Sequence, residues 1–126
     1  GPSAPLAADG VFLVTGGLGA LGRATARGLL DRLPGARVVL GGRRDPQALD
    51  AIERTFLETP GIAGRLSYRR LDLDDAERLA TQVAALRADF GRLDGVFHAA
   101  GTTRDRALRQ KTADELRAVF APKVLG

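Results

Sequence analysis

Short apolar runs alternate with longer segments of helical pattern, and this alternation constrains the fold more than any other feature of the sequence. The run Val11–Val14 is apolar throughout, which is typical of a strand buried on both faces. Further strands are expected at 36–40, 66–71 and 94–99, and helices at 20–33, 45–58, 74–90 and from 112 onward. Strands that alternate with crossover helices form parallel sheets with right-handed connections. The sequence therefore predicts an α/β fold, a Rossmann-like doubly wound parallel sheet that contains four β-α units.

Capping residues define where three of these helices should begin. Asp45-Pro46 combines an N-cap with proline at the first helical position and predicts the start of the second helix. Asp74 with Glu77, and Thr112 with Glu115, have the spacing of a capping box. These pairs predict the starts of the third and fourth helices.

Composition narrows the class of protein and its partners. The 126 residues include 19 basic and 15 acidic side chains, but the basic ones are scattered and only 5% of residues are aromatic, so no nucleic-acid surface is predicted. The sequence has no cysteine, no secretory signal and no apolar run of about 20 residues, which argues against a disulfide scaffold and a membrane protein. We therefore expect a cytoplasmic location. Gly1–Ser3 resembles an expression-tag remnant, and because methionine is absent, residues 4–126 are expected to be part of a domain from a longer polypeptide.

A glycine-rich segment joins the first predicted strand to the first predicted helix. Within TGGLGALG at 15–22, Gly17, Gly19 and Gly22 match the pattern GxGxxG. Between a strand and a helix, such glycines allow a tight turn and let a pyrophosphate approach the backbone and the helix N-terminus. We interpret the segment as half of a dinucleotide site; the alternative is a glycine-rich turn that binds nothing.

The end of the second predicted strand carries Arg43 and Arg44. Dinucleotide-binding folds place a residue that contacts the adenosine ribose here, about 20 residues after the glycines. A guanidinium binds a 2′-phosphate by charge and by its forked geometry, whereas a carboxylate would repel it. The arginines therefore favour NADPH over NADH; the alternative is a pair of exposed arginines with no ligand.

Five segments together resemble a known family. They are TGGLGALG at 15–22, LGGRR at 40–44, Asp72-Leu73, HAAG at 98–101 and FAPKVLG at 120–126. With them the chain is similar to the ketoreductase domain of modular polyketide synthases, in the short-chain dehydrogenase/reductase superfamily. The resemblance implies NADPH-dependent reduction of a β-ketoacyl thioester on an acyl carrier protein to a β-hydroxyacyl thioester. It implies the carrier protein and the neighbouring synthase domains as partners.

The resemblance also implies roles for individual residues. The glycines would hold the pyrophosphate, Arg43 the 2′-phosphate, Asp72 and Leu73 the adenine, and Ala99 to Gly101 the nicotinamide ribose. Lys123 would be catalytic, assisting the active site electrostatically. No metal site is predicted, and His98 is interpreted as structural because no partner acid or nucleophile is evident. The cofactor-binding residues predicted in full are Thr15, Gly17, Gly19, Leu21, Gly22, Arg43, Arg44, Asp72, Leu73, Ala99, Ala100 and Gly101.

The family's catalytic serine and tyrosine follow the lysine, and this chain has neither after Lys123. Its tyrosine is Tyr68, and its serines are Ser3 and Ser67. General acid catalysis is commonly worth a factor of about 10² to 10⁴, so the chain alone is expected to be inactive. Two alternatives stay open: a non-catalytic ketoreductase-like module for structure or association, and a stand-alone short-chain reductase.

The resemblance also implies that the doubly wound sheet is truncated after the fourth β-α unit, which would expose one edge of the sheet. The fourth strand would present unpaired backbone groups along Val96 and Phe97. A homodimer or a complementing chain is therefore expected to pair with this edge.

Overall fold

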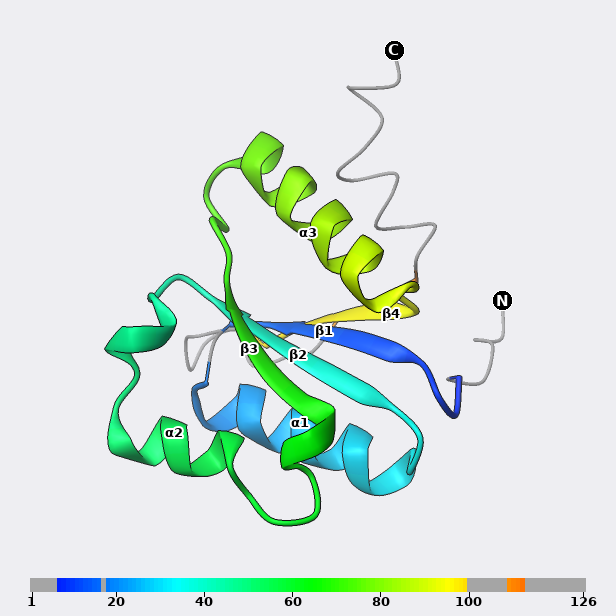
Figure 1. The fold of residues 1–126 in the computed structure, drawn as a ribbon. Coiled ribbons are helices and arrows are strands. Elements are labelled where there is room, and N and C mark those ends of the chain that lie inside the picture. The colour runs from blue at the N-terminus through cyan, green and yellow to red at the C-terminus, as the bar shows by residue number, and fades with distance from the viewer. Residues whose placement is uncertain (1–6, 17, 100–108, 113–126) are drawn as a thin grey trace.

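A computed structural model of the chain describes residues 7–16, 18–99 and, as backbone, 109–112. Within these ranges five strands form one sheet, and helices cover both of its faces (Figure 1). None of the helices in these ranges is long and apolar enough to cross a membrane. In chain order the elements are β1 (Val11–Thr15), α1 (Ala20–Arg32), β2 (Arg37–Gly42), the 3₁₀ turn η1 (Pro46–Ala48), α2 (Ala51–Leu57), the 3₁₀ turn η2 (Ala63–Arg65), β3 (Leu66–Arg70), α3 (Ala76–Phe90), β4 (Gly95–His98) and β5 (Arg109–Thr112).

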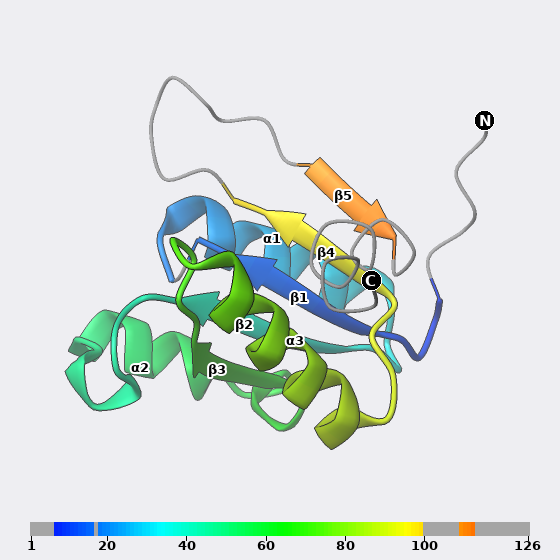
Figure 2. The same cartoon turned by 90° about the horizontal axis from the view of Figure 1, so that it is seen from above.

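The strands lie in the order β3-β2-β1-β4-β5 (Figure 2). β1 pairs in parallel with β2 on one side and with β4 on the other, and β2 pairs in parallel with β3. The chain therefore adds β2 and β3 on one side of β1 and then crosses to add β4 on its other side. The Rossmann-like doubly wound arrangement is confirmed.

Two hydrophobic cores explain why the strands are apolar on both faces. Along β1, Phe12 and Val14 belong to the core that includes α1, whereas Val11 and Leu13 belong to the core that includes α3. All four side chains are at most 1% exposed. Figure 1 shows α1 and α2 on one face of the sheet and α3 on the other. A polar substitution at any of these four positions would therefore disrupt one of the two cores.

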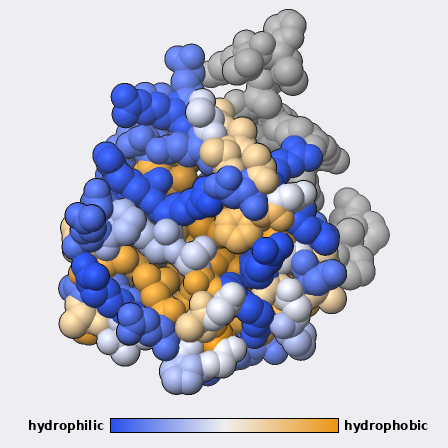
Figure 3. Space-filling view, in the orientation of Figure 1, coloured by the Kyte–Doolittle hydropathy of each residue, from blue (hydrophilic) through white to orange (hydrophobic). Residues whose placement is uncertain are grey.

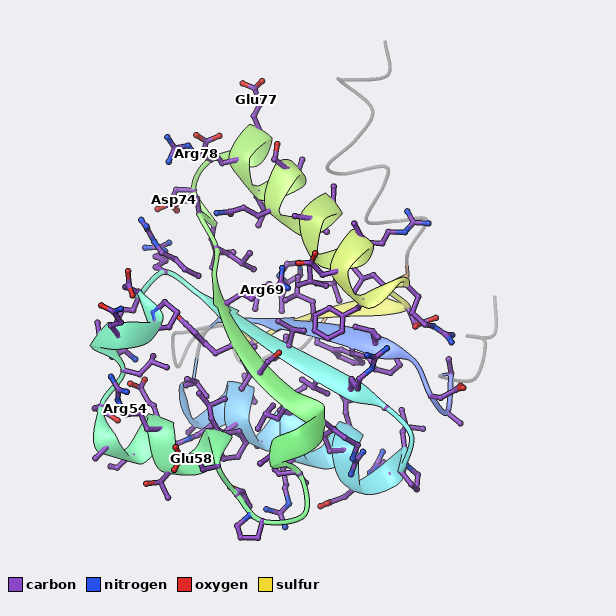
Figure 4. The ribbon with its side chains drawn as sticks, viewed as in Figure 1. Arg54, Glu58, Arg69, Asp74, Glu77 and Arg78 are labelled. Carbon is purple, nitrogen blue, oxygen red and sulfur yellow. The ribbon has the colours of Figure 1, made fainter. Side chains whose placement is uncertain are left out.

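The predicted second helix is divided in the structure. Asp45 caps only the short turn η1, through a 3.0 Å bond from the Gln47 amide. A second cap at Asp50 then starts α2, and its capping box with Glu53 satisfies two backbone amides. Arg54, labelled in Figure 4, donates to the carbonyl groups of Gln47 and Leu49. The prediction of one helix over 45–58 was wrong because this second, local cap starts the α-helix later.

The start of α3 also differs from the prediction by one residue. Its N-cap is Asp75, whose side chain accepts from the Arg78 amide, and not Asp74. At the other end Gly91 adopts a left-handed conformation with a φ of 81°, which glycine accommodates without strain. The buried stripe of Leu79, Val83 and Leu86 lies between these caps, as the apolar spacing predicted.

The edge of β4 that was predicted to be free is paired within the chain itself. β5 runs antiparallel to it, with Val96 opposite Lys111 and Phe97 opposite Gln110. Thr112, predicted to start a fourth helix, lies in β5; the rest of that helix falls outside the described residues. An antiparallel strand needs no crossover connection of about a dozen residues or more. β5 can therefore pair with the edge of β4 without a helix between them. The requirement for a second copy or a complementing chain at Val96 and Phe97 is therefore removed.

Candidate functional site

The members of the predicted site that the structure describes lie at the carboxyl edge of the parallel strands. Thr15 ends β1, Arg43 follows β2, Asp72 follows β3 and Ala99 follows β4. In an open parallel sheet, ligands bind outside this edge, where the strand order reverses. Here the reversal lies between β1 and β4, the pair that also carries the glycine-rich turn. The topology therefore places the candidate site at that turn.

Gly16 joins the end of β1 to the end of β4. Its φ is 106°, and a Cβ atom built on it would lie 2.0 Å from the Ala99 carbonyl oxygen. The Ala99 amide in turn donates to the Thr15 carbonyl over 2.9 Å. Only glycine fits this position, yet it was missing from the predicted site. The available signal was its place directly after the strand, where the chain must turn sharply.

The Thr15 hydroxyl holds the same two strands together. It lies 2.6 Å from His98 Nδ1 and donates to the Phe97 carbonyl over 3.5 Å. Which atom donates in the short contact between the hydroxyl and Nδ1 depends on the tautomer of His98. His98 therefore has a hydroxyl partner, in agreement with its structural interpretation. Contact between Thr15 and a cofactor stays a prediction.

The N-terminus of α1 opens onto this edge. Its N-cap, Gly19, has no side-chain cap, and a Cβ atom there would meet nothing within 4 Å. No acidic residue occupies the first turn. The free amides and the positive end of the helix dipole are therefore available to an anion. Leu18 and Gly22 are buried and Leu21 is packed against the core, so they fix the turn on the sheet.

Arg43 forms an exposed ion pair with Asp74 on the surface. Its guanidinium lies 2.9 Å from the Asp74 carboxylate, and the two side chains are 67% and 78% exposed. Exposed pairs of this kind are worth about 1 kcal/mol or less. Asp74 lies beside the start of α3 (Figure 4). The surface at that end of α3 is hydrophilic (Figure 3). A phosphate dianion could displace this carboxylate at small cost.

Arg44 has a different environment from Arg43. Its guanidinium pairs with Glu53, whose side chain is only 8% exposed, and its carbonyl accepts from the Tyr68 hydroxyl over 2.8 Å. Burial raises the pKa of Tyr68, so this hydroxyl stays protonated as the donor. Arg44 thus anchors the loop after β2 to α2 and β3. Its predicted contact with a cofactor is not tested by these contacts.

Asp72 is fixed by several side chains after β3. Gln82 makes two hydrogen bonds to it, and Arg70 and Arg78 lie 3.6 Å and 3.7 Å from its carboxylate oxygens. Leu73 packs against the core on the α3 side. A shallow hollow of about 370 Å³ beside Asp72 is lined by the first two turns of α3. Of the two residues predicted to flank an adenine, Asp72 is therefore next to accessible space, and Leu73 is not among the residues that line it.

Comparison with known proteins identifies the family. The sequence profile of the KR domain family matches residues 10–126. The chain belongs to the KR, or ketoreductase, domain family. KR domains share the short-chain dehydrogenase/reductase fold and use nicotinamide cofactors, and the relatives of this one are polyketide synthases.

Relatives and solved structures agree with this assignment. Polyketide synthase ThaG of Burkholderia thailandensis is 38% identical over 122 residues, which are 97% of this chain and 2% of ThaG. Spectinabilin polyketide synthase system protein NorB of Streptomyces orinoci is 40% identical over 120 residues, 94% of this chain and 5% of NorB. A ketoreductase domain from the bacillaene assembly line superimposes with a TM-score of 0.65 at 29% identity, covering 98% of this chain and 30% of that one. This KR domain sequence thus spans a small part of the large multidomain proteins that it matches.

Some predicted site residues of the KR domain lie outside the described residues. They are Gly17, Ala100, Gly101 and Lys123. The described members of the set share one edge of the sheet, and Gly16 joins them.

Proposed function

We propose that this KR domain sequence binds NADPH and forms the cofactor-binding part of a ketoreductase that acts on an acyl chain during polyketide assembly. The observation that carries the proposal is the common position of an uncapped helix N-terminus at Gly19 and an exposed arginine, Arg43, at the same sheet edge. The first suits a diphosphate and the second a 2′-phosphate. The residues present therefore fit a phosphorylated dinucleotide.

Each described residue has a distinct task in this proposal. The α1 amides next to Gly19 bind the diphosphate, Arg43 exchanges Asp74 for the 2′-phosphate, and Asp72 with Leu73 borders the adenine. Gly16 keeps β1 and β4 close enough for Ala99 to line the path toward the nicotinamide. When bound, NADPH would supply a hydride to the carbonyl carbon of a β-ketoacyl thioester, and a proton delivered to the carbonyl oxygen would complete the β-hydroxyacyl thioester. An acyl carrier protein among the neighbouring synthase domains would present that thioester.

We expect this chain by itself to bind the cofactor without reducing a ketone. Proton donation to the carbonyl oxygen requires an accessible acid, and in this family the acid is a tyrosine. The only tyrosine here, Tyr68, lies in β3 and donates to the Arg44 carbonyl. Mixing the chain with NADPH and a β-ketoacyl thioester should leave NADPH absorbance unchanged; steady oxidation of NADPH would contradict the expected inactivity.

The test of the binding proposal is a calorimetric titration with NADPH and with NADH. Replacing Arg43 with alanine should weaken NADPH binding by about 10- to 100-fold, since one charge-assisted contact is worth about 1.5–3 kcal/mol, and should leave NADH binding nearly unchanged. Arg27→Ala is the matched control, because it also removes one arginine from an exposed ion pair, with Asp31 in α1. Equal NADPH binding by Arg43→Ala and the parent chain would disprove the phosphate assignment. Absence of NADPH binding by the parent would instead favour a non-catalytic association module.

A further inference from the structure

Gln82 of α3 holds Asp72 at two points at once. The Asp72 backbone amide donates to Gln82 Oε1 over 2.8 Å, and Gln82 Nε2 donates to the Asp72 carboxylate oxygen Oδ2 over 3.1 Å. A backbone amide can only donate and a carboxylate can only accept, so one orientation of the side-chain amide satisfies both. The contact therefore fixes the loop after β3 and the direction of the carboxylate together.

The other partners of Asp72 cannot replace this contact. Arg70 lies 3.6 Å from Oδ1 and Arg78 lies 3.7 Å from Oδ2, which are ion-pair distances but too long for good hydrogen bonds. Both arginines are more than half exposed and therefore weakly held. Gln82 thus supplies the short, directional bonds, and it engages Oδ2 while Oδ1 has only the longer ionic contact to Arg70.

Asp72 is also accessible to a ligand. Its side chain is 24% exposed, and it lines the shallow hollow of about 370 Å³ together with Gln82 and Thr81. A carboxylate oxygen at such a position can accept a hydrogen bond from an exocyclic amino group, which adenine carries and hypoxanthine lacks.

We propose that Gln82 is a positioning residue for base recognition: by holding Oδ2 and the backbone amide of Asp72, it turns Oδ1 toward the amino group of the adenine. The inference rests on the proposed NADPH site and adds to it a determinant of base preference on α3. The role proposed for Gln82 is exerted through its two hydrogen bonds to Asp72.

The first test compares NADP⁺ with its hypoxanthine analogue by calorimetric titration of the full chain. The parent chain should prefer NADP⁺. Gln82→Leu should weaken NADP⁺ binding by about fivefold to tenfold and hardly affect the analogue, so that the preference falls toward one. Thr59→Val is the control, since it removes a side-chain hydrogen bond just after α2, to the Phe56 carbonyl, without involving Asp72 or the residues that line the hollow. It should retain the parent preference.

A second variant distinguishes positioning from a merely structural role. Gln82→Glu can still accept from the Asp72 amide, but its other oxygen faces Oδ2, and the like charges raise the pKa of the carboxylate pair. Near neutral pH the two groups repel each other, whereas a proton shared at lower pH restores the donor. The preference for NADP⁺ should therefore recover in Gln82→Glu as the pH falls, while the defect of Gln82→Leu stays constant.

Three outcomes overturn the inference. An unchanged preference in folded Gln82→Leu removes the positioning role and leaves the proposed function intact. Equal weakening of both ligands, with no recovery of Gln82→Glu at low pH, assigns Gln82 a structural role only. Failure of the parent chain to bind either ligand removes the proposed function and the positioning role with it.

Discussion

The two halves of the proposed cofactor site are built in different ways. At the turn from β1 to α1 the backbone makes the surface, with Gly16 against Ala99 and an uncapped helix end at Gly19. At the ends of β2 and β3 charged side chains make it, with Arg43 and Asp72 in contacts on the surface. The comparison teaches that Gly16 in the first half is needed for stability, whereas Arg43 in the second half can change ligand preference with little effect on the fold.

Replacing Gly16 with alanine should have the largest effect on stability. The new Cβ atom would overlap the Ala99 carbonyl oxygen, and its φ of 106° is strained for any residue with a side chain. We expect a loss of about 3 kcal/mol and a drop in melting temperature of about 10 °C, measured by thermal denaturation. Gly64→Ala is the control, because a Cβ atom at Gly64 meets nothing within 4 Å. A melting temperature for Gly16→Ala equal to that of the control would show that β1 and β4 do not need this close contact.

The two neighbouring arginines should separate stability from cofactor preference. Arg44→Ala should lower the free energy of unfolding by about 1–2 kcal/mol, because it leaves the buried Glu53 carboxylate without its cation. Arg43→Ala should change it by less than about 1 kcal/mol, since its pair with Asp74 is exposed. Urea denaturation measures both. The preference for NADPH over NADH should be lost in Arg43→Ala and kept in Arg44→Ala. Loss of the preference in Arg44→Ala alone would mean that Arg44, and not Arg43, binds the 2′-phosphate.

The sequence predicted the backbone-built half well because its signals are local. A β-branched run followed by glycines and a helical pattern indicates a strand, a turn and a helix within a dozen residues, and Gly19 lies where that pattern placed it. Gly16 was missed as a site residue although its place directly after the strand was a local signal; the close approach of Ala99, 83 positions later, is visible only in the fold. The parallel pairing of β1 to β4 followed from the alternation alone, whereas their order in the sheet was not predicted.

The side-chain half was less predictable because its contacts are long-range. Arg43 and Arg44 look equivalent in the sequence, and only the fold shows that one meets Asp74 and the other Glu53. Gln82 carries no motif and is recognised only by its bonds to Asp72. β5 has the sequence RQKT, without the apolar alternation that would have predicted a strand. Only its backbone pairing with β4 identifies it. The one-residue error at the start of α3 arose because Asp74 and Asp75 are both good caps.

The opposite edge of the sheet offers a comparison without cofactor residues. Bonds from Arg92, and one from the Val11 amide, hold the pKa of the Asp94 carboxyl below its ordinary value despite partial burial. A lowered pKa in the folded state means that Asp94 stabilises the protein above its unfolded pKa of about 3.9, and that this contribution is lost as the pH falls through the folded value.

Asp94→Asn should therefore cost about 1 kcal/mol at neutral pH, and the difference from the parent should shrink below about pH 4, as followed by urea denaturation over a pH series. NADPH affinity at neutral pH should not change. A stability difference that persists unchanged at low pH would show that the charge of Asp94 is not what stabilises this edge.

The smallest change in stability should come from replacing Gly19 with serine. This substitution should raise the free energy of unfolding while it lowers NADPH affinity. Gly19 has a φ of −67° and a ψ of 174°, which suit serine at an N-cap, and a Cβ atom there meets nothing within 4 Å. Gly19→Ser should stabilise the fold by about 0.5 kcal/mol, because its hydroxyl caps an α1 amide. The same hydroxyl would occupy a donor and the space that a diphosphate needs, so NADPH affinity should fall by about tenfold. Calorimetry and thermal denaturation on the same sample measure both effects. If affinity and stability rose together, the open helix end would not be the place where the diphosphate binds.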